Sequence, residues 1–370
     1  MIGNVFVLAV VLAVGIVLWR RRFAAVQSAV KSPLRTDSEI REFLVERIDK
    51  HRQSVGMVVG VIDPAGGRIG AYGSLDKNDP RPVDDDTVFE IGSVTKVFTS
   101  LLLAAMVERG EVALTDPVAS YLPPGVTVPE RGGRQITLQD LATHTSGLPR
   151  LPSNLAPKSW ANPYADYSTE NLYQFLSTYK LKRDIGSQYK YSNLGGGLLG
   201  HVLARRAGLE YSALVQSLIC EPLGMKDTSI VLSSDMKARF AAGHNRRLKR
   251  VANWDLPTLA GAGALRSTAN DLLVFLAAQL GHIESPLAPA MAAMLAVRRP
   301  TGVRGQQVAL GWHIWAGDGR EIIWHHGGTG GYRSFIGYDP QSGIGAAVLS
   351  NANTPAGVDD VGQRLIPRAS

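Results

Sequence analysis

The stretch Phe89-Glu90-Ile91-Gly92-Ser93-Val94-Thr95-Lys96 joins a strand-like run to a long apolar helix pattern that begins at Ser93. In a helix, residues three apart lie on one face, so the Ser93 hydroxyl and the Lys96 amine are expected to share one space. Burial lowers the pKa of a lysine, and a neutral lysine can take the proton of a serine hydroxyl. The stretch therefore predicts a nucleophilic serine at the start of a helix.

The spacing Ser-x-x-Lys has little specificity by itself, since this chain contains it six times. The copies start at Ser28, Ser74, Ser93, Ser177, Ser187 and Ser234. Only the copy at Ser93 follows a strand-like run and a glycine and opens an apolar helix, whose free N–H groups and positive dipole end favour developing negative charge. The alternative interpretation of this copy is an ordinary N-cap serine followed by a solvated lysine.

Composition indicates an ordinary globular chain with an unusual start. With 370 residues, of which 45% are hydrophobic and 19% charged, the chain can bury a large core and has room for about two domains. The net charge of +7 is spread over short clusters such as residues 20–22 and 246–250. No long basic helix is expected, so we predict no nucleic-acid partner. The single cysteine, Cys220, excludes an internal disulfide.

Residues 2–19 are apolar apart from Asn4, and as a helix they would extend about 27 Å, close to the thickness of a bilayer core. A cleaved signal peptide carries its basic residues before the apolar run, whereas here the arginines follow it. We therefore predict a membrane anchor over residues 1–22 and a linker over 23–35. The positive-inside rule favours the cytoplasmic side for the residues that follow.

The order of the remaining patterns predicts an α+β fold. Thr36 to Glu39 has capping-box spacing, so the catalytic domain is expected to span residues 36–370. Strand-like runs over 56–63 and 68–73 flank a plausible hairpin loop. Helix patterns follow near 169–180, 193–207, 211–220 and 268–280, strand signals return over 310–315, 321–324, 334–338 and 343–349, and a final helix is expected over 358–365. We expect an antiparallel sheet built from about 36–92 and 309–370, with a helical part over about 93–308.

The stretch Tyr191-Ser192-Asn193 is a second candidate for catalysis, because it precedes a glycine-rich helix start where backbones approach closely. A phenol near a lysine ammonium loses its proton more easily and can shuttle protons. Asn193 offers both a donor and an acceptor. Alone, such a stretch is most often a turn.

A third stretch runs from His325 to Tyr332 and contains four glycines. The Gly328 N–H group can form an oxyanion hole with the Ser93 N–H group. The alternative is a glycine-rich hairpin. Paired histidines can also indicate a metal, but no nearby Cys, Asp or Glu completes a ligand set, so we predict no metal site.

Together, residues 93–96, 191–193 and 325–327 resemble the motifs of the penicillin-recognising serine hydrolases, in their order and rough spacing. This family includes class C β-lactamases, DD-peptidases and related esterases. The resemblance covers nearly all of the chain after residue 36 and extends to residues 141–149 and 261–268. It is greatest to the AmpH-type DD-carboxypeptidase/endopeptidases.

The resemblance implies a β-lactamase/transpeptidase-like fold, with helices flanking an antiparallel sheet, an all-helical subdomain and the site in the cleft between them. It implies that Ser93 is the acylated nucleophile, with Lys96 and Tyr191 handling its proton. The residues implied to contact the substrate are Asn193, His325, Gly327 and Gly328, with the N–H groups of Ser93 and Gly328 as the oxyanion hole. No cofactor is implied, and the family places the domain on the periplasmic side, against the positive-inside rule.

One departure concerns the substrate. Class C β-lactamases have Lys-Thr-Gly where this chain has His325-His326-Gly327. A histidine with a pKa near 6.5 is mostly neutral at pH 7, so it would hold a carboxylate weakly and more strongly toward pH 6; Arg333 is another possible source of charge. We expect a serine acyl hydrolase acting on D-Ala-containing cell-wall peptides or β-lactams. The alternatives are an esterase for small acyl esters and a non-catalytic penicillin-binding sensor domain.

Overall fold

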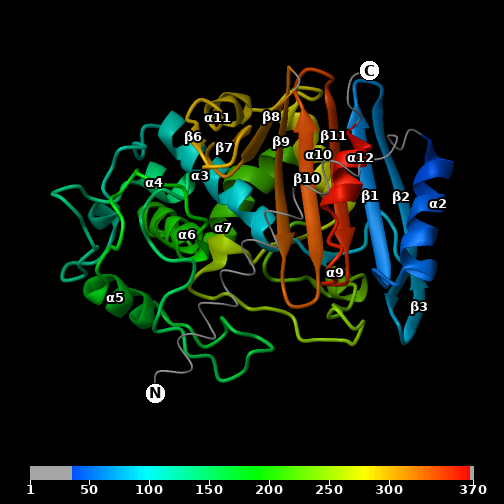
Figure 1. Cartoon of the computed structure of the whole chain (residues 1–370), viewed down its shortest axis with the longest axis horizontal. Helices are drawn as coiled ribbons and strands as arrows, with labels where there is room; N and C mark the ends of the chain where they lie inside the picture. The colour runs from blue at the N-terminus through cyan, green and yellow to red at the C-terminus, as the bar shows by residue number, and fades with distance from the viewer. Residues whose placement is uncertain (1–35, 318, 367–370) are drawn as a thin grey trace.

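The computed structural model describes residues 36–317 and 319–366 (Figure 1). The predicted membrane anchor and linker lie outside these residues. Within the described ranges, no helix is long and apolar enough to cross a membrane.

The centre of the molecule is a nine-stranded sheet in the order β3-β2-β1-β11-β10-β9-β8-β7-β6, with antiparallel neighbours throughout. Its strands are β1 (Gly56–Asp63), β2 (Gly66–Asp76), β3 (Asp79–Pro82), β6 (Arg299–Pro300), β7 (Gln306–Val308), β8 (His313–Gly317), β9 (Arg320–Gly328), β10 (Arg333–Asp339) and β11 (Ile344–Ser350). Figure 1 shows the early strands β1 and β2, in blue, beside the late strands β9 to β11, in orange and red. The sheet is built from both ends of the chain, and it also includes β6 and β7, which lie within residues 93–308, the part expected to be helical.

Local signals explain the first elements. The side chain of Thr36 and that of Glu39 cap α2 (Asp37–Val45) reciprocally, as predicted. The predicted hairpin between β1 and β2 is also confirmed, and Gly66 makes its turn with a φ of +134°. The edge strands β3 and β6 and the neighbouring strand β7 were not predicted, because two to four residues rich in proline or polar side chains give no periodic signal.

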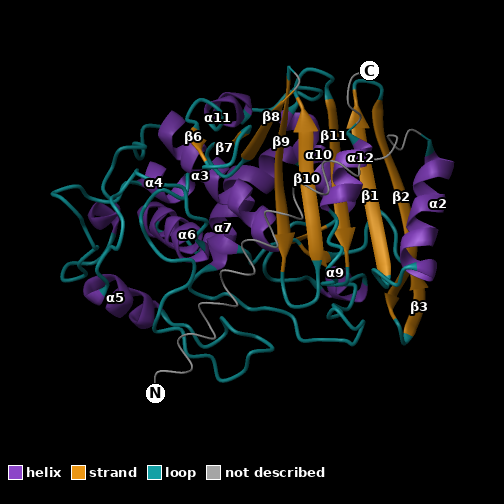
Figure 2. Cartoon of the chain, in the orientation of Figure 1, coloured by secondary structure: helices purple, strands orange, loops and turns teal. Residues whose placement is uncertain are grey.

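Helices cover both faces of the sheet (Figure 2). On one face, α10 (Ala269–Gln279) packs against β1 and β11, with Leu273 close to Gly60. On the other face, α2 and α12 (Asp359–Leu365) cover a smaller core that includes Ile40 and Phe335. Apolar burial on both faces is the main stabilising contribution to such a layered fold.

The remaining helices lie mostly beside the sheet, as Figure 2 shows. They are α3 (Thr95–Glu108), α4 (Leu138–Ala142), α5 (Thr169–Thr178), α6 (Asn193–Ala207), α7 (Tyr211–Val215), α8 (Glu221–Leu223), α9 (Ser234–Ala238) and α11 (Ala288–Ala293). Every residue of α3 from Thr95 to Met106 is buried, so α3 is the central helix of the larger core. This arrangement confirms the predicted class of an antiparallel sheet flanked by helices.

Candidate active site

Ser93 and Lys96 meet at the start of α3. The two-residue strand β4 (Phe89–Glu90) pairs with β5 (Arg266–Ser267) and leads into a 3-10 turn, Gly92–Val94, ahead of the α-helix. Gly92 enters this turn with a φ of +49°, which a residue with a side chain adopts only with strain. The Nζ atom of Lys96 lies 3.1 Å from Ser93 Oγ. The sequence-predicted pair is therefore in hydrogen-bonding contact.

The amine of Lys96 has two further partners from distant parts of the chain. It donates to Asn193 Oδ1 at 3.0 Å and to the carbonyl oxygen of Ala262 at 2.6 Å. Asn193 in turn donates from Nδ2 to Tyr164 Oη at 3.2 Å, which sets the orientation of its amide. Lys96 is only 3% exposed, and burial, with a smaller contribution from the charge of Arg150, lowers its pKa well below the usual value.

The ring of Tyr191 covers this pair. It lies 4.9 Å from Lys96 Nζ and 5.2 Å from Arg150 Cζ. Burial raises the pKa of Tyr191 to about 12, although a hydrogen bond with Ser93 and the charge of Arg150 act in the opposite direction. The expectation of an easily deprotonated phenol is therefore wrong, because the effect of burial on the pKa of Tyr191 exceeds the opposite effects of Ser93 and Arg150. Tyr191 is a proton donor at neutral pH.

Residues 141–149 hold the Tyr191-Ser192-Asn193 segment in place. His144 has a left-handed backbone with a φ of +58°, and its Nδ1 accepts a hydrogen bond from the Ser192 N–H group at 3.3 Å. Ser192 Oγ donates to the carbonyl of Pro149 at 2.6 Å and accepts from the Gly195 N–H group at 2.8 Å, which caps α6. The strained backbone at His144 is maintained by these contacts.

The glycines at the end of β9 pack against the start of the serine turn. A Cβ atom on Gly92 would lie 2.7 Å from the Gly328 nitrogen, and a Cβ atom on Gly327 would clash with the carbonyl of Ile91. Only glycine allows this close approach. It brings the N–H groups of Ser93 and Gly328 to the same region, as the predicted oxyanion hole requires. The pairing of β8 with β9 ends at Trp324, so along the described chain the outer edge of residues 325–328 has no strand partner.

His325 faces this region but differs from the expectation of a titrating histidine. It is 1% exposed, and its Nδ1 lies 2.7 Å from the carbonyl oxygen of His326, which assigns the ring proton to Nδ1. Its Nε2 is buried and has no hydrogen-bond partner in the part of the chain that the structure describes. Burial, helped by the neighbouring His313, lowers the pKa of His325 well below 6.5. The predicted gain of carboxylate binding toward pH 6 depends on protonation of His325, which this shift of its pKa opposes.

Several residues at the site escaped the sequence analysis. They are Arg150, Tyr164, Ala262 and His313. Arg150 directly follows residues 141–149, and Ala262 lies within residues 261–268, so their positions beside these stretches were the available signal; Tyr164 sits in a stretch without any motif. Among residues 36–317 and 319–366, no group of three or more His, Cys, Asp or Glu side chains is arranged to hold a metal ion.

Comparison with known proteins links this geometry to one family. Residues 42–369 match the family described as Beta-lactamase. The D-alanyl-D-alanine-carboxypeptidase/endopeptidase AmpH of Escherichia coli strain K12 is 36% identical over 336 residues, which cover 85% of this chain and 85% of that protein. A β-lactamase of Pseudomonas fluorescens is 26% identical over 355 residues, covering 86% of this chain and 94% of that protein.

Solved structures agree with the sequence relatives. A class C β-lactamase from Rhodobacter sphaeroides is 28% identical, covers 85% of this chain and 94% of its own, and superposes with a TM-score of 0.74. A β-lactamase/D-alanine carboxypeptidase from Yersinia pestis, solved with citrate, is 27% identical, covers 89% of this chain and 99% of its own, and has a TM-score of 0.76.

Proposed function

Because the chain belongs to the β-lactamase family, we propose that it is a serine acyl hydrolase that acts on D-Ala-containing cell-wall peptides or β-lactams through an acyl-Ser93 intermediate. Relatives named as a D-alanyl-D-alanine-carboxypeptidase/endopeptidase and as β-lactamases support this substrate class. The observation that carries the proposal is the contact between the Ser93 hydroxyl and the buried amine of Lys96.

The hydrogen-bond partners of Lys96 suit a neutral amine. A neutral amine has two N–H groups and one lone pair. The two carbonyl oxygens, Asn193 Oδ1 and Ala262 O, can only accept, so they take the two N–H groups. In the structure Nζ also donates to Ser93 Oγ at 3.1 Å, and once the amine is neutral its lone pair can take the proton of the Ser93 hydroxyl. This arrangement supports Lys96 as the general base.

The steps follow from these positions. Lys96 takes the proton as Ser93 Oγ bonds to the substrate carbonyl carbon, and the oxyanion that forms faces the N–H groups of Ser93 and Gly328. Collapse of this intermediate breaks the C–N bond, and the leaving nitrogen takes a proton from Tyr191, which Lys96 then reprotonates. Water then attacks the carbonyl carbon of the acyl-serine and loses a proton to Lys96. As the C–O bond to Ser93 breaks, Ser93 Oγ takes that proton from Lys96, which returns the amine to its neutral form.

The charge of the substrate separates the candidate functions. Neutral His325 provides no cation for a carboxylate. The exposed guanidinium of Arg150 lies over Tyr191, and within the described residues no carboxylate forms an ion pair with it. Arg150 can attract an anionic substrate to the mouth of the site. The neutral His325 favours hydrolysis of uncharged acyl esters as the second candidate function.

The cellular location is a separate part of the proposal. The apolar run over residues 2–19 supports a single N-terminal anchor, and the proposed cell-wall substrates, which lie outside the cytoplasmic membrane, favour a periplasmic catalytic domain. Deletion of residues 1–22 should move the protein from the membrane fraction to the soluble fraction. Retention of the deleted protein in membranes would contradict the anchor.

A fluorescent penicillin, a D-Ala-D-Ala peptide and an uncharged nitrophenyl ester test the function together. Wild-type protein should form a covalent label on Ser93 and release D-Ala from the peptide, whereas Ser93→Ala should lose both by several powers of ten. Ester hydrolysis without labelling would favour the esterase. A label that never leaves, without peptide hydrolysis, would indicate a sensor domain, and activity of Ser93→Ala equal to wild type would remove Ser93 from the mechanism.

A further inference from the structure

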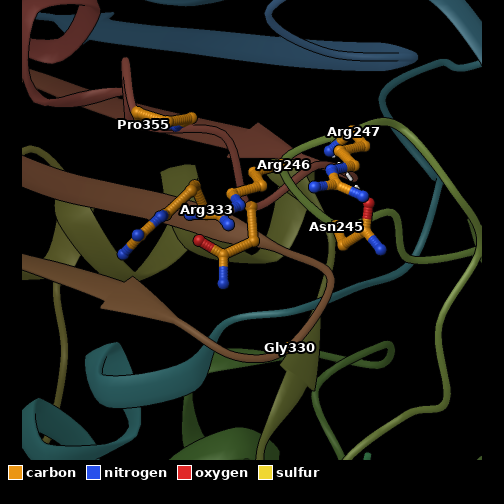
Figure 3. Close-up of a pocket in the computed structure, with 7 residues that line it drawn as sticks. Asn245, Arg246, Arg247, Gly330, Arg333 and Pro355 are labelled. Atoms are coloured by element: carbon orange, nitrogen blue, oxygen red, sulfur yellow. Dashed lines mark hydrogen bonds between the residues drawn. The ribbon is translucent and has the colours of Figure 1, made fainter.

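A second hollow lies beside the glycine-rich end of β9 (Figure 3). It has a volume of about 610 Å³ and is lined by three arginines, Arg246, Arg247 and Arg333, together with Asn245, Asn353 and Gly330. Figure 3 shows Arg246 and Arg247 on one side of it and Arg333 and Pro355 on the other. No acidic side chain lines it. This volume is in the range of sites for small molecules. We call it the arginine pocket.

The loop that carries two of the arginines is held in one conformation. The side-chain oxygen of Asn245 accepts hydrogen bonds from the N–H groups of Arg247 at 2.9 Å and Lys249 at 3.2 Å. Leu248 turns the chain with a φ of +54° and is buried against Val55 and Ala352. These hydrogen bonds and the burial of Leu248 hold the backbone of the loop in place. The side chains of Arg246 and Arg247 are exposed.

Positive charge dominates the arginine pocket. Within the described chain, neither Arg246 nor Arg247 forms an ion pair, whereas Arg250 in the same loop pairs with Asp76 at 3.1 Å. The charge of Arg333 helps to lower the pKa of Asp359, but that carboxylate is already bound to His326 at 2.8 Å. Three arginine side chains thus line the hollow, and the charges of Arg246 and Arg247 leave a net attraction for an anion.

The arginine pocket adjoins the candidate active site. Arg333 lies directly opposite Gly328 in the pairing of β9 with β10. A Cβ atom on Gly328 would come within 2.6 Å of Arg333 Nη1, so the guanidinium rests against the glycine proposed for the oxyanion hole. The arginine pocket therefore begins at the residue that is paired with Gly328.

We propose that the arginine pocket binds a carboxylate or phosphate group that the acyl substrate carries away from its scissile bond; this rests on the proposed function of the site. Guanidinium groups bind such oxyanions through two parallel hydrogen bonds, a geometry that a single lysine does not provide. Because His325 is neutral, the arginines of the pocket, and not His325, bind the charged group of the substrate. The enzyme selects anionic acyl substrates over neutral ones of the same size.

Direct binding tests the arginine pocket without any turnover. Full-length protein carrying Ser93→Ala is titrated by calorimetry with glutarate, with neutral glutaramide and with inorganic phosphate at constant ionic strength. Glutarate or phosphate should bind and glutaramide should not. Arg246→Ala and Arg247→Ala should each weaken anion binding about tenfold, as the loss of one charge-assisted hydrogen-bonded contact predicts. Tighter binding of phosphate than of glutarate would assign the group to phosphate, and the reverse to a carboxylate.

Lys249→Ala is the matched control, because it removes one positive charge from the same loop at a residue that does not line the hollow. It should change anion affinity less than twofold. Equal losses in Lys249→Ala and Arg246→Ala would indicate general charge attraction and overturn the site, as would unchanged binding in both arginine variants.

Matched substrates then connect the arginine pocket to catalysis. Two substrates share a scissile bond and differ in one remote carboxylate or carboxamide. The ratio of their kcat/KM values, acid over amide, should fall about tenfold in Arg246→Ala, mainly through KM. Loss of glutarate binding with an unchanged ratio would overturn the link to the substrate. Absence of hydrolysis by wild-type protein would instead refute the proposed function, while the titration still decides whether the arginine pocket binds anions.

Discussion

The Nζ atom of Lys96 lies 2.6 Å from the backbone carbonyl oxygen of Ala262, a residue 166 positions later in the chain. The stem of the same lysine packs against Gly196, where a Cβ atom would lie 2.9 Å from Lys96 Cε. These contacts exclude water from the amine, and burial without a carboxylate partner favours its neutral form. The position of Lys96 therefore depends on α6 and on the segment before β5 as much as on α3.

Gly196→Ala should lower the acylation rate by tenfold or more while leaving stability nearly unchanged. The added methyl group pushes Lys96 away from Ser93, and a small misplacement of a catalytic group costs much activity. Replacing glycine by alanine inside a helix is otherwise favourable by about 1 kcal/mol. Stopped-flow acylation by a chromogenic β-lactam or ester, together with thermal unfolding, measures both effects.

Gly195→Ala is the matched control, since it makes the same change one residue earlier in α6 and meets Ser192 Oγ at 3.3 Å, which requires that side chain to move by only a few tenths of an ångström and leaves Lys96 untouched. It should keep most of the activity. If the two variants acylate at equal rates, the packing of Gly196 does not position Lys96.

Tyr191→Phe should reduce the rate constant of acylation by amides by two powers of ten or more, because it removes the proton donor for the leaving nitrogen. Its ring contacts with His144 and Arg150 remain, so stability should change little. Reactive esters, whose leaving groups need no proton, should be affected less. Equal losses for amide and reactive ester substrates would argue against the donor role.

Arg150→Gln should shift the acid limb of the kcat/KM profile to higher pH. The charge of Arg150 contributes to lowering the pKa of Lys96, and the neutral amine is the active form. Removing this cation raises the pKa of Lys96, so a higher pH is needed to deprotonate it. Arg150→Lys keeps the charge and should keep the profile. If the acid limb of the kcat/KM profile lies at the same pH in Arg150→Gln as in wild type, the titration of Lys96 does not determine that limb.

Stability should decrease as the pH falls below about 6.5. Burial lowers the pKa values of His144, His313 and His325, so the unfolded chain binds protons there that the folded chain does not. Each such histidine costs about 1.4 kcal/mol of unfolding free energy per pH unit between its unfolded and folded pKa values. Together these three histidines contribute about 4 kcal/mol per unit to the slope just below that range, and His201, with its pKa lowered to about 4, adds to it in the same direction. Urea unfolding at pH 7, 6 and 5 measures this slope.

His144→Asn removes the contribution of one of these histidines to the pH dependence of stability. Asparagine tolerates the left-handed backbone at this position, and its side-chain oxygen can accept the hydrogen bond from Ser192. The slope in the variant should therefore decrease by about 1.4 kcal/mol per pH unit. An unchanged slope would mean that His144 is protonated equally in the folded and unfolded states.

Features that depend on neighbouring residues could be predicted from the sequence. The capping box at Thr36, the hairpin between β1 and β2 and the helix periods all arise from contacts within a few positions. The pairing of Ser93 with Lys96 belongs to this class, because one helical turn brings positions three apart together. The order of the three motifs, residues 93–96, 191–193 and 325–327, then identified the family.

The chemical states at the site were decided by the tertiary structure. Whether Lys96 is neutral, whether Tyr191 keeps its proton and whether His325 titrates all depend on burial among residues from distant segments. The arginine pocket likewise forms only where the loop after His244 meets the start of β10. The sequence by itself determined which groups are present and which of them are local neighbours. Solvent exclusion and charge proximity, which set protonation, require the folded chain.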